Sequence, residues 1–366
     1  YIRAVNALWN NAAHKKLYVT GGIGARHQGE AFGDDYELPN ATAYCETCAN
    51  IANVYWNHRM FLLHGEARYI DVMERSLYNS VISGVSLDGK RFFYPNPLES
   101  EGNYERSEWF GCACCPGNIT RFLASVSGYA YAVRGNEAYV NLFGQSQAEL
   151  SIDGQKVKIV QETKFPWEGR IVLKIQPEKE ETSMVLNVRI PDWATDDFRS
   201  SELYHFTEPL ERPAAVAVNG QPTTLQTVKG YAVISRTWKA GDTVTVELPM
   251  PNRRILCDRR VQDNIGKTAF QRGPLVYCLE WPDVEGGKVL NLMIEPDAPL
   301  EAAYRAGLLG GVTVLRGMGM EIVRSGEQIS KTPRAFEAIP YYAWAHRGPG
   351  QMAVWIAGTE AAVRKN

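Results

Sequence analysis

The chain has 366 residues, of which 45% are hydrophobic and 22% are charged, and its formal net charge is −2. This length leaves room for two or three domains, and this charge gives no basic face for nucleic acid and no acidic tail. No apolar run is long enough to cross a membrane and no signal-peptide pattern opens the chain, so we expect a cytoplasmic protein without nucleic-acid or membrane partners.

The first predicted helix occupies residues 1 to about 17, where apolar residues recur at helical spacing. A glycine-rich loop follows at residues 18–24. It lacks the Lys-Ser/Thr pair of a P-loop and the βαβ frame of a dinucleotide site, so we do not expect it to bind phosphate. The loop continues to Pro39 and carries four carboxylates, a kind of residue that is usually solvated but also serves catalysis in loops: Glu30, Asp34, Asp35 and Glu37.

Three more helices are predicted before residue 134. Apolar residues recur on one helical face over residues 47 to 64, and again, after a break at Gly65, as far as Val81. A further helix is expected to begin near Asn118, because Pro116 and Asn118 are typical of a helix start. Long helices joined by loops predict an all-α first region.

Near Arg134 the period of the hydrophobic pattern changes from about 3.6 to about 2, which predicts strands. Four runs alternate or are β-branched: residues 138–142, 171–175, 185–190 and 243–248. Turn signals such as Asn219-Gly220 separate them, and short strands at this spacing predict a β-sandwich. Pro249 and Pro251 end this module because proline cannot continue a central strand, and a second β region follows.

Two short clusters, Cys45-Glu46-Thr47-Cys48 and Cys112-Ala113-Cys114-Cys115, hold five of the seven cysteines. Disulfides are one interpretation, but paired thiols at this spacing in a chain without a secretion signal favour zinc. On a helix Cys45 and Cys48 share a face, whereas Glu46 and Cys48 lie about 200° apart. Spacing alone therefore favours a closed structural site of four thiolates: Cys45, Cys48, Cys112 and Cys115.

Several motifs over the whole chain are shared with one enzyme family. In the first region they are Thr20-Gly21-Gly22-Ile23-Gly24, Glu30-Ala31-Phe32-Gly33, Glu46-Thr47-Cys48-Ala49, Glu74-Arg75-Ser76-Leu77-Tyr78-Asn79 and Cys114-Cys115-Pro116-Gly117-Asn118. Later they are Arg189-Ile190-Pro191-Asp192-Trp193, Gln271-Arg272-Gly273-Pro274-Leu275-Val276-Tyr277 and Ile339-Pro340-Tyr341-Tyr342-Ala343-Trp344. With these motifs the chain resembles glycoside hydrolase family 127, the β-L-arabinofuranosidase family, without its N-terminal part.

The resemblance implies a multidomain fold of α and β structure. Residues 1–133 would be the C-terminal part of an (α/α)6 catalytic barrel, residues 134–250 a middle β-sandwich and residues 251–366 a C-terminal β-sandwich. An incomplete barrel would leave apolar helix faces without a partner in the chain. We therefore expect exposed apolar side chains on the helices, with a homodimer as one consequence.

The resemblance also implies a bacterial retaining exo-glycosidase that releases β-L-arabinofuranose from the non-reducing ends of plant-type glycans. Glu46, Cys48, Cys114 and Cys115 would hold zinc, with Cys114 as the nucleophile and Glu30 as the general acid/base. Two further positions match sugar-contacting residues: Glu74 and Tyr94. Two alternatives stay open, namely hydrolysis of another sugar, such as a branched acidic sugar of pectin, and a zinc-stabilised carbohydrate-binding fragment without catalysis.

Elementary chemistry is consistent with this ligand set. Zinc and a helix N-terminus both favour the thiolate of a cysteine whose free pKa is about 8.5, and the helix near Asn118 would supply the second effect. Glu30 would protonate the leaving oxygen and later activate water. Two ligands two residues apart must face one metal, so we expect residues 46–48 not to be regular helix. Cys45 and Cys112 would then be bystanders.

Overall fold

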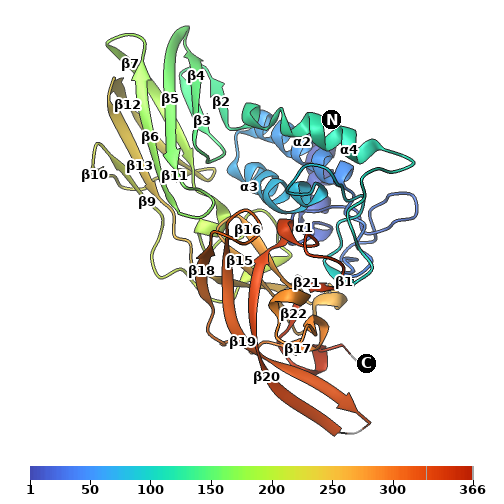
Figure 1. The fold of residues 1–366 in the computed structure, drawn as a ribbon. Helices are drawn as coiled ribbons and strands as arrows, with labels where there is room; N and C mark the ends of the chain where they lie inside the picture. Colours follow the sequence, from blue (N-terminus) through green and yellow to red (C-terminus); the bar gives the residue numbers. More distant parts are fainter. Residues whose placement is uncertain (327, 365–366) are drawn as a thin grey trace.

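Four α-helices lie in the N-terminal third of the chain, and strands make up most of the rest (Figure 1). The computed structural model describes residues 1–326 and 328–364. Its helices are α1 (Ile2–Lys15), α2 (Thr47–His64), α3 (Ala67–Arg75) and α4 (Cys114–Leu123), and a π-helical turn continues α3 over Ser76–Val81. The predicted range of α2 is confirmed. Gly65 ends this helix at a φ of 64°, a left-handed conformation that glycine adopts at little cost.

The first region is not all-α, so that prediction was wrong. Most of residues 16–46 and 85–113 is irregular, and strand β1 (Glu99–Glu101) pairs with β21 (Gln351–Ala353) near the other end of the chain. The helices pack around a shared core, but they do not establish the partial (α/α)6 barrel, which stays a prediction. Exposed apolar side chains on the helices are confirmed: Ile2, Leu8, Leu62, Leu63 and Leu123. Among the described residues, no helix is long and apolar enough to span a membrane.

Two sheets pack face to face between residues 131 and 247. One has the order β10-β9-β13-β6-β5-β4 and the other β11-β12-β7-β3-β2. The first comprises β4 (Ser146–Ile152), β5 (Gln155–Thr163), β6 (Arg170–Pro177), β9 (Ala215–Val218), β10 (Gln221–Pro222) and β13 (Asp242–Glu247). The second comprises β2 (Tyr131–Arg134), β3 (Glu137–Val140), β7 (Glu181–Arg189), β11 (Thr227–Val228) and β12 (Tyr231–Lys239). Alternate residues of both sheets enter one core, as the period-2 pattern predicts.

The remaining strands form one eleven-stranded sheet in the described part of the chain. They are β1 and β21 with β8 (Tyr204–Phe206), β14 (Arg253–Cys257), β15 (Lys267–Arg272), β16 (Leu275–Glu280), β17 (Leu292–Met293), β18 (Glu301–Arg305), β19 (Val312–Ser325), β20 (Gln328–Pro340) and β22 (Ile356–Ala357). The order β16-β20-β19-β17-β22-β15 returns to β16, because β15 also pairs with β16. Within the described residues this sheet closes on itself and recruits β1 and β8 from earlier in the chain, whereas a sandwich has two separate sheets; the expected domain bounds stay a prediction.

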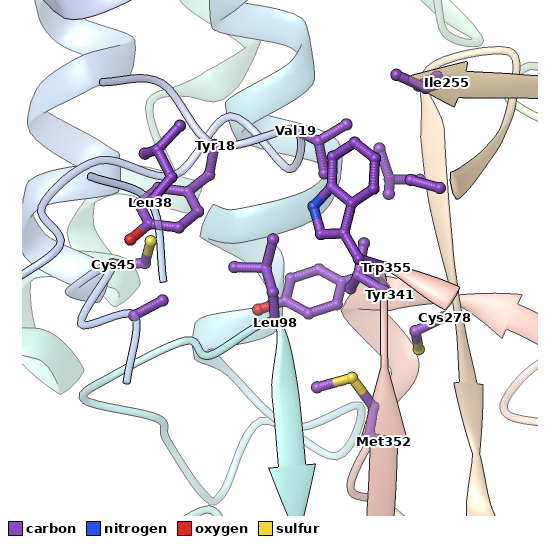
Figure 2. Packing of buried hydrophobic residues seen from close by; sticks show 14 of the residues in the cluster. Tyr18, Val19, Leu38, Cys45, Leu98, Ile255, Cys278, Tyr341, Met352 and Trp355 are labelled. Atoms are coloured by element: carbon purple, nitrogen blue, oxygen red, sulfur yellow. The ribbon is translucent and has the colours of Figure 1, made fainter. Parts of the chain in front are cut away.

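A hydrophobic core joins the N-terminal loops to this closed sheet (Figure 2). Tyr18, Leu38 and Cys45 come from the loops, and they pack in one cluster with Tyr341 and Trp355 from the C-terminal region. Each of these five side chains is at most 3% exposed. The C-terminal region therefore fixes the loop that leads into α2. The first cysteine cluster lies where this loop meets the helix.

Candidate metal centre and active site

The N-termini of α2 and α4 meet at a cluster of one carboxylate and three thiols. Glu46 directly precedes α2, Cys48 lies in the first turn of that helix, and Cys114 and Cys115 open α4. One ligand atom from each of the four lies within 4.8 Å of the others. Glu46 Oε1 lies 3.4 Å from Cys114 Sγ and from Cys115 Sγ. The structure thus brings together the four expected ligands, and they could hold a metal ion.

A change of backbone direction at Glu46 lets two residues so close in sequence face one point. Glu46 has φ −53° and ψ 137°, outside helical geometry, and α2 begins at Thr47. The prediction that residues 46–48 avoid regular helix is therefore correct for Glu46 and wrong for Thr47 and Cys48. The helical separation of about 200° does not apply, because only one of the two residues is helical.

The structure does not bring Cys45 and Cys112 into the cluster. Cys45 is fully buried in the core of Figure 2, whereas Cys112 is exposed. All seven cysteines are free, so no disulfide competes with a metal. The helix predicted to begin near Asn118 in fact begins at Cys114. Both thiols of that helix therefore lie in its first turn, where the helix dipole favours a negative charge.

The thiols of the cluster differ in acidity. Hydrogen bonding with Cys115 lowers the pKa of Cys48 to about 7, against the opposing effect of burial. Burial raises the pKa of Cys114 to about 11. The hydrogen bond with Cys48, and then burial, raise the pKa of Cys115 well above its usual range. Near neutral pH the metal-free cluster therefore keeps most of its thiol protons.

Metal affinity is expected to depend steeply on pH, because metal binding must displace these thiol protons. Between pH 8 and pH 6 protons add to Cys48 as well, so the affinity should fall by roughly two to three powers of ten per pH unit. Competition with a chromophoric chelator at several pH values measures this slope, and calorimetry in two buffers counts the protons released. An affinity that does not change with pH would show that the thiols are not ligands.

Glu30 and Cys114 are connected through two tyrosines. Glu30 is exposed on its loop with a φ of 49°, and Tyr44 donates a hydrogen bond of 3.0 Å to its Oε1. The ring of Tyr44 lies 6.2 Å from that of Tyr94, whose hydroxyl is 2.9 Å from Cys114 Sγ. Tyr94 thus lies at the cluster, and its expected contact with the sugar stays a prediction. Sequence reasoning missed Tyr44, and only its place one residue before Cys45 could have pointed to it.

Glu74 lies in a buried ion pair, and its expected contact with the sugar stays a prediction. Its side chain is 1% exposed and lies between α3 and the middle sandwich. Its carboxylate pairs with Arg189 of β7 and accepts a hydrogen bond of 2.8 Å from Trp193 Nε1. Asp71, almost one turn earlier in α3, binds the same guanidinium at 2.7 Å. The shared motif identified Glu74 in the sequence, but it could not show on which face of α3 the side chain lies.

Three family models match the chain. The model described as "Beta-L-arabinofuranosidase, GH127 catalytic domain" matches residues 1–128, and the corresponding middle domain matches residues 137–250. The "Glycoside hydrolase family 127 C-terminal domain" matches residues 252–357. The chain belongs to glycoside hydrolase family 127. The relatives that follow, and the family itself, are glycoside hydrolases.

Known members of family 127 are similar over nearly the whole chain. A non-reducing end beta-L-arabinofuranosidase of Bifidobacterium longum subsp. longum is 32% identical over 97% of this chain and 55% of its own length. A solved GH127 beta-arabinofuranosidase is 44% identical, with a TM-score of 0.96, over 100% of this chain and 57% of its own. The GH127 beta-L-arabinofuranosidase of Geobacillus stearothermophilus T6 is 41% identical, with a TM-score of 0.89, over 97% and 56%. The chain therefore spans little more than half the length of these relatives.

Proposed function

We propose that the chain carries the catalytic centre of a retaining exo-glycosidase that releases β-L-arabinofuranose from the non-reducing ends of plant-type glycans. This proposal rests mainly on the position of Cys114. It is the exposed member of the four-ligand cluster, whereas Glu46 and Cys115 are buried. A sulfur on the open side of a metal cluster can reach a sugar. The names of the relatives support the choice of arabinofuranose.

Zinc is the metal that we propose for the site. Three thiolates and one carboxylate match its preference for sulfur together with nitrogen or oxygen in a four-coordinate site. Glu46, Cys48, Cys114 and Cys115 would hold it. When bound, zinc would keep these sulfurs ionised at neutral pH, which the raised pKa of Cys114 otherwise prevents.

Cys114 and Glu30 divide the chemistry in this proposal. Cys114 Sγ attacks the anomeric carbon, so that a carbon–sulfur bond forms while the bond to the glycosidic oxygen breaks. Glu30 gives its proton to that oxygen, and the alcohol leaves. Glu30 then takes a proton from water, whose oxygen attacks the same carbon and releases Cys114 as thiolate. Two inversions restore the original configuration, so the product retains it.

Other residues would orient these two groups. Tyr44 donates a hydrogen bond to Glu30 Oε1, so Glu30 Oε2 stays available to give and take the proton. Tyr94 can donate a hydrogen bond to the sulfur of Cys114. In this scheme residues 1–133 supply the chemistry. The domains at 134–250 and 251–366 support it through shared cores such as that of Figure 2.

Release of nitrophenol from p-nitrophenyl β-L-arabinofuranoside tests the activity. We expect turnover by the zinc-loaded chain, or by a chimera that adds the part of a solved relative that this chain does not cover. The α-anomer and p-nitrophenyl glycosides of other sugars are the matched controls. Faster hydrolysis of a glycoside of another sugar would overturn the proposed specificity for β-L-arabinofuranose. If both proteins bind zinc but hydrolyse none of these glycosides, the proposed glycosidase activity is refuted. The alternative of a carbohydrate-binding fragment without catalysis would then stand.

A further inference from the structure

The carbonyl oxygen of Cys45 accepts hydrogen bonds from the side-chain amides of two asparagines, one in α2 and one in the loop before β1. Asn50 Nδ2 and Asn96 Nδ2 each donate to this oxygen at 2.9 Å. Both asparagines are fully buried. The N–H of Cys45 in turn donates to the carbonyl of Gly24 at 2.8 Å. Hydrogen bonds thus hold the peptide group on each side of this one residue.

Cys45 needs this support because its backbone is in a costly conformation. Its φ is 39°, in the left-handed region that residues other than glycine seldom adopt. Such a conformation persists only where the surroundings fix it. The buried amides supply hydrogen bonds that the carbonyl would lose in an extended or helical backbone, and this loss inside a dry core is costly.

Asn96 also forms hydrogen bonds with residues on both sides of Glu46. Its backbone N–H donates to the carbonyl of Tyr44 at 2.9 Å, and its Nδ2 is 3.0 Å from Thr47 Oγ1. Thr47 is fixed further, because its hydroxyl donates to the carbonyl of Phe93 at 2.8 Å. The backbone on either side of Glu46 is therefore held, and from this position Glu46 Oε1 lies 3.4 Å from both thiols of α4.

We propose that Asn50 and Asn96 are positioning residues for the metal centre, which act through the Cys45 carbonyl to turn Glu46 towards Cys48. This inference rests on the zinc site of the proposed function. If the left-handed turn relaxed and α2 extended backwards, Glu46 would point about 200° away from Cys48 and leave the cluster. The amides touch no ligand atom of the cluster, so they set ligand geometry without entering it.

Zinc affinity of this chain, measured by chelator competition, tests the proposal without any sugar substrate. Asn96→Ala and Asn50→Ala should each weaken zinc binding by about 10-fold to 100-fold, the usual effect of removing a residue that orients a ligand. Asn79→Ala is the matched control. Asn79 is equally buried, and its amide bonds the carbonyls of Arg75 and Pro274, away from the turn. Its loss should leave zinc affinity within about twofold of the parent chain.

Glycine at position 45 provides a rescue. Because glycine adopts positive φ at little cost, Cys45→Gly should keep zinc bound, and in the Asn96→Ala background it should recover part of the lost affinity. Wild-type affinity in both folded Asn→Ala variants would overturn the inference, as would equal weakening in Asn79→Ala. If Asn96→Ala does not fold, Asn50→Ala and the rescued double variant decide in the same way. A wild-type chain that binds no zinc would overturn the zinc site itself, and this inference with it.

Discussion

Replacing Cys114 by serine is expected to lower turnover of p-nitrophenyl β-L-arabinofuranoside by at least about 10³-fold, as loss of a catalytic nucleophile typically does. A serine hydroxyl is far less acidic than a thiol, so it cannot supply the attacking anion. The variant keeps Glu46, Cys48 and Cys115, three of the four proposed ligands. The loss should therefore appear in kcat while the fold is retained.

A second variant, Glu30→Gln, tests the other half of the mechanism. It should slow the reaction through loss of leaving-group protonation, and least for glycosides with acidic leaving groups, because these need little proton donation. A haloacetamide that carries L-arabinofuranose should label Cys114, as peptide mass mapping can show. Label on Cys115 or Glu46 instead, or full activity of Cys114→Ser, would refute the assignment.

Replacing Arg189 by leucine is expected to cost about 3–5 kcal/mol of unfolding free energy, the usual effect of removing one partner of a buried ion pair. Arg189 is fully buried, and it pairs with Asp71 and Glu74, which are at most 2% exposed. Its Nε also donates to the Asn141 carbonyl at 2.6 Å. Without the guanidinium, two carboxylates would stay in the interface between α3 and the sandwich with less positive charge beside them.

Urea denaturation measures this loss, and Arg134→Leu is the matched control. Arg134 pairs with Glu137 at 2.7 Å, but its side chain is 67% exposed. A surface pair of this kind contributes at most about 1 kcal/mol. If the Arg189 variant is no less stable than the Arg134 variant, the buried cluster does not hold the helices to the sandwich.

Local patterns in the sequence were sufficient for much of the fold. The recurrence of apolar residues every 3.6 positions and the glycine at position 65 predicted both ends of α2, because a helix and its stop signal are local properties. Period-2 alternation likewise gave the middle sandwich. The pairing of β1 with β21 could not be predicted, since it joins residues about 250 positions apart that carry no local signal for each other.

The site was predictable in its membership but not in its geometry. Two cysteine clusters and the family motifs identified the four residues that the structure groups. Asn96, 51 positions further along the chain, donates to the Cys45 carbonyl beside the turn at Glu46, and no local signal announces this contact, so spacing alone wrongly favoured Cys45 as a ligand. The buried pairing of Glu74 with Arg189 could not be predicted, because a motif gives a position in the chain, whereas burial depends on what that face of α3 contacts.

Anomalous diffraction from crystals of the zinc-loaded chain is the most direct test of the proposed centre, because it locates the metal among the cysteines. We expect one zinc ion bonded to Glu46 Oε1, Cys48 Sγ, Cys114 Sγ and Cys115 Sγ, with Cys114 on the open side. Zinc held by four sulfurs that include Cys45 or Cys112 would contradict this centre and indicate a closed structural site instead.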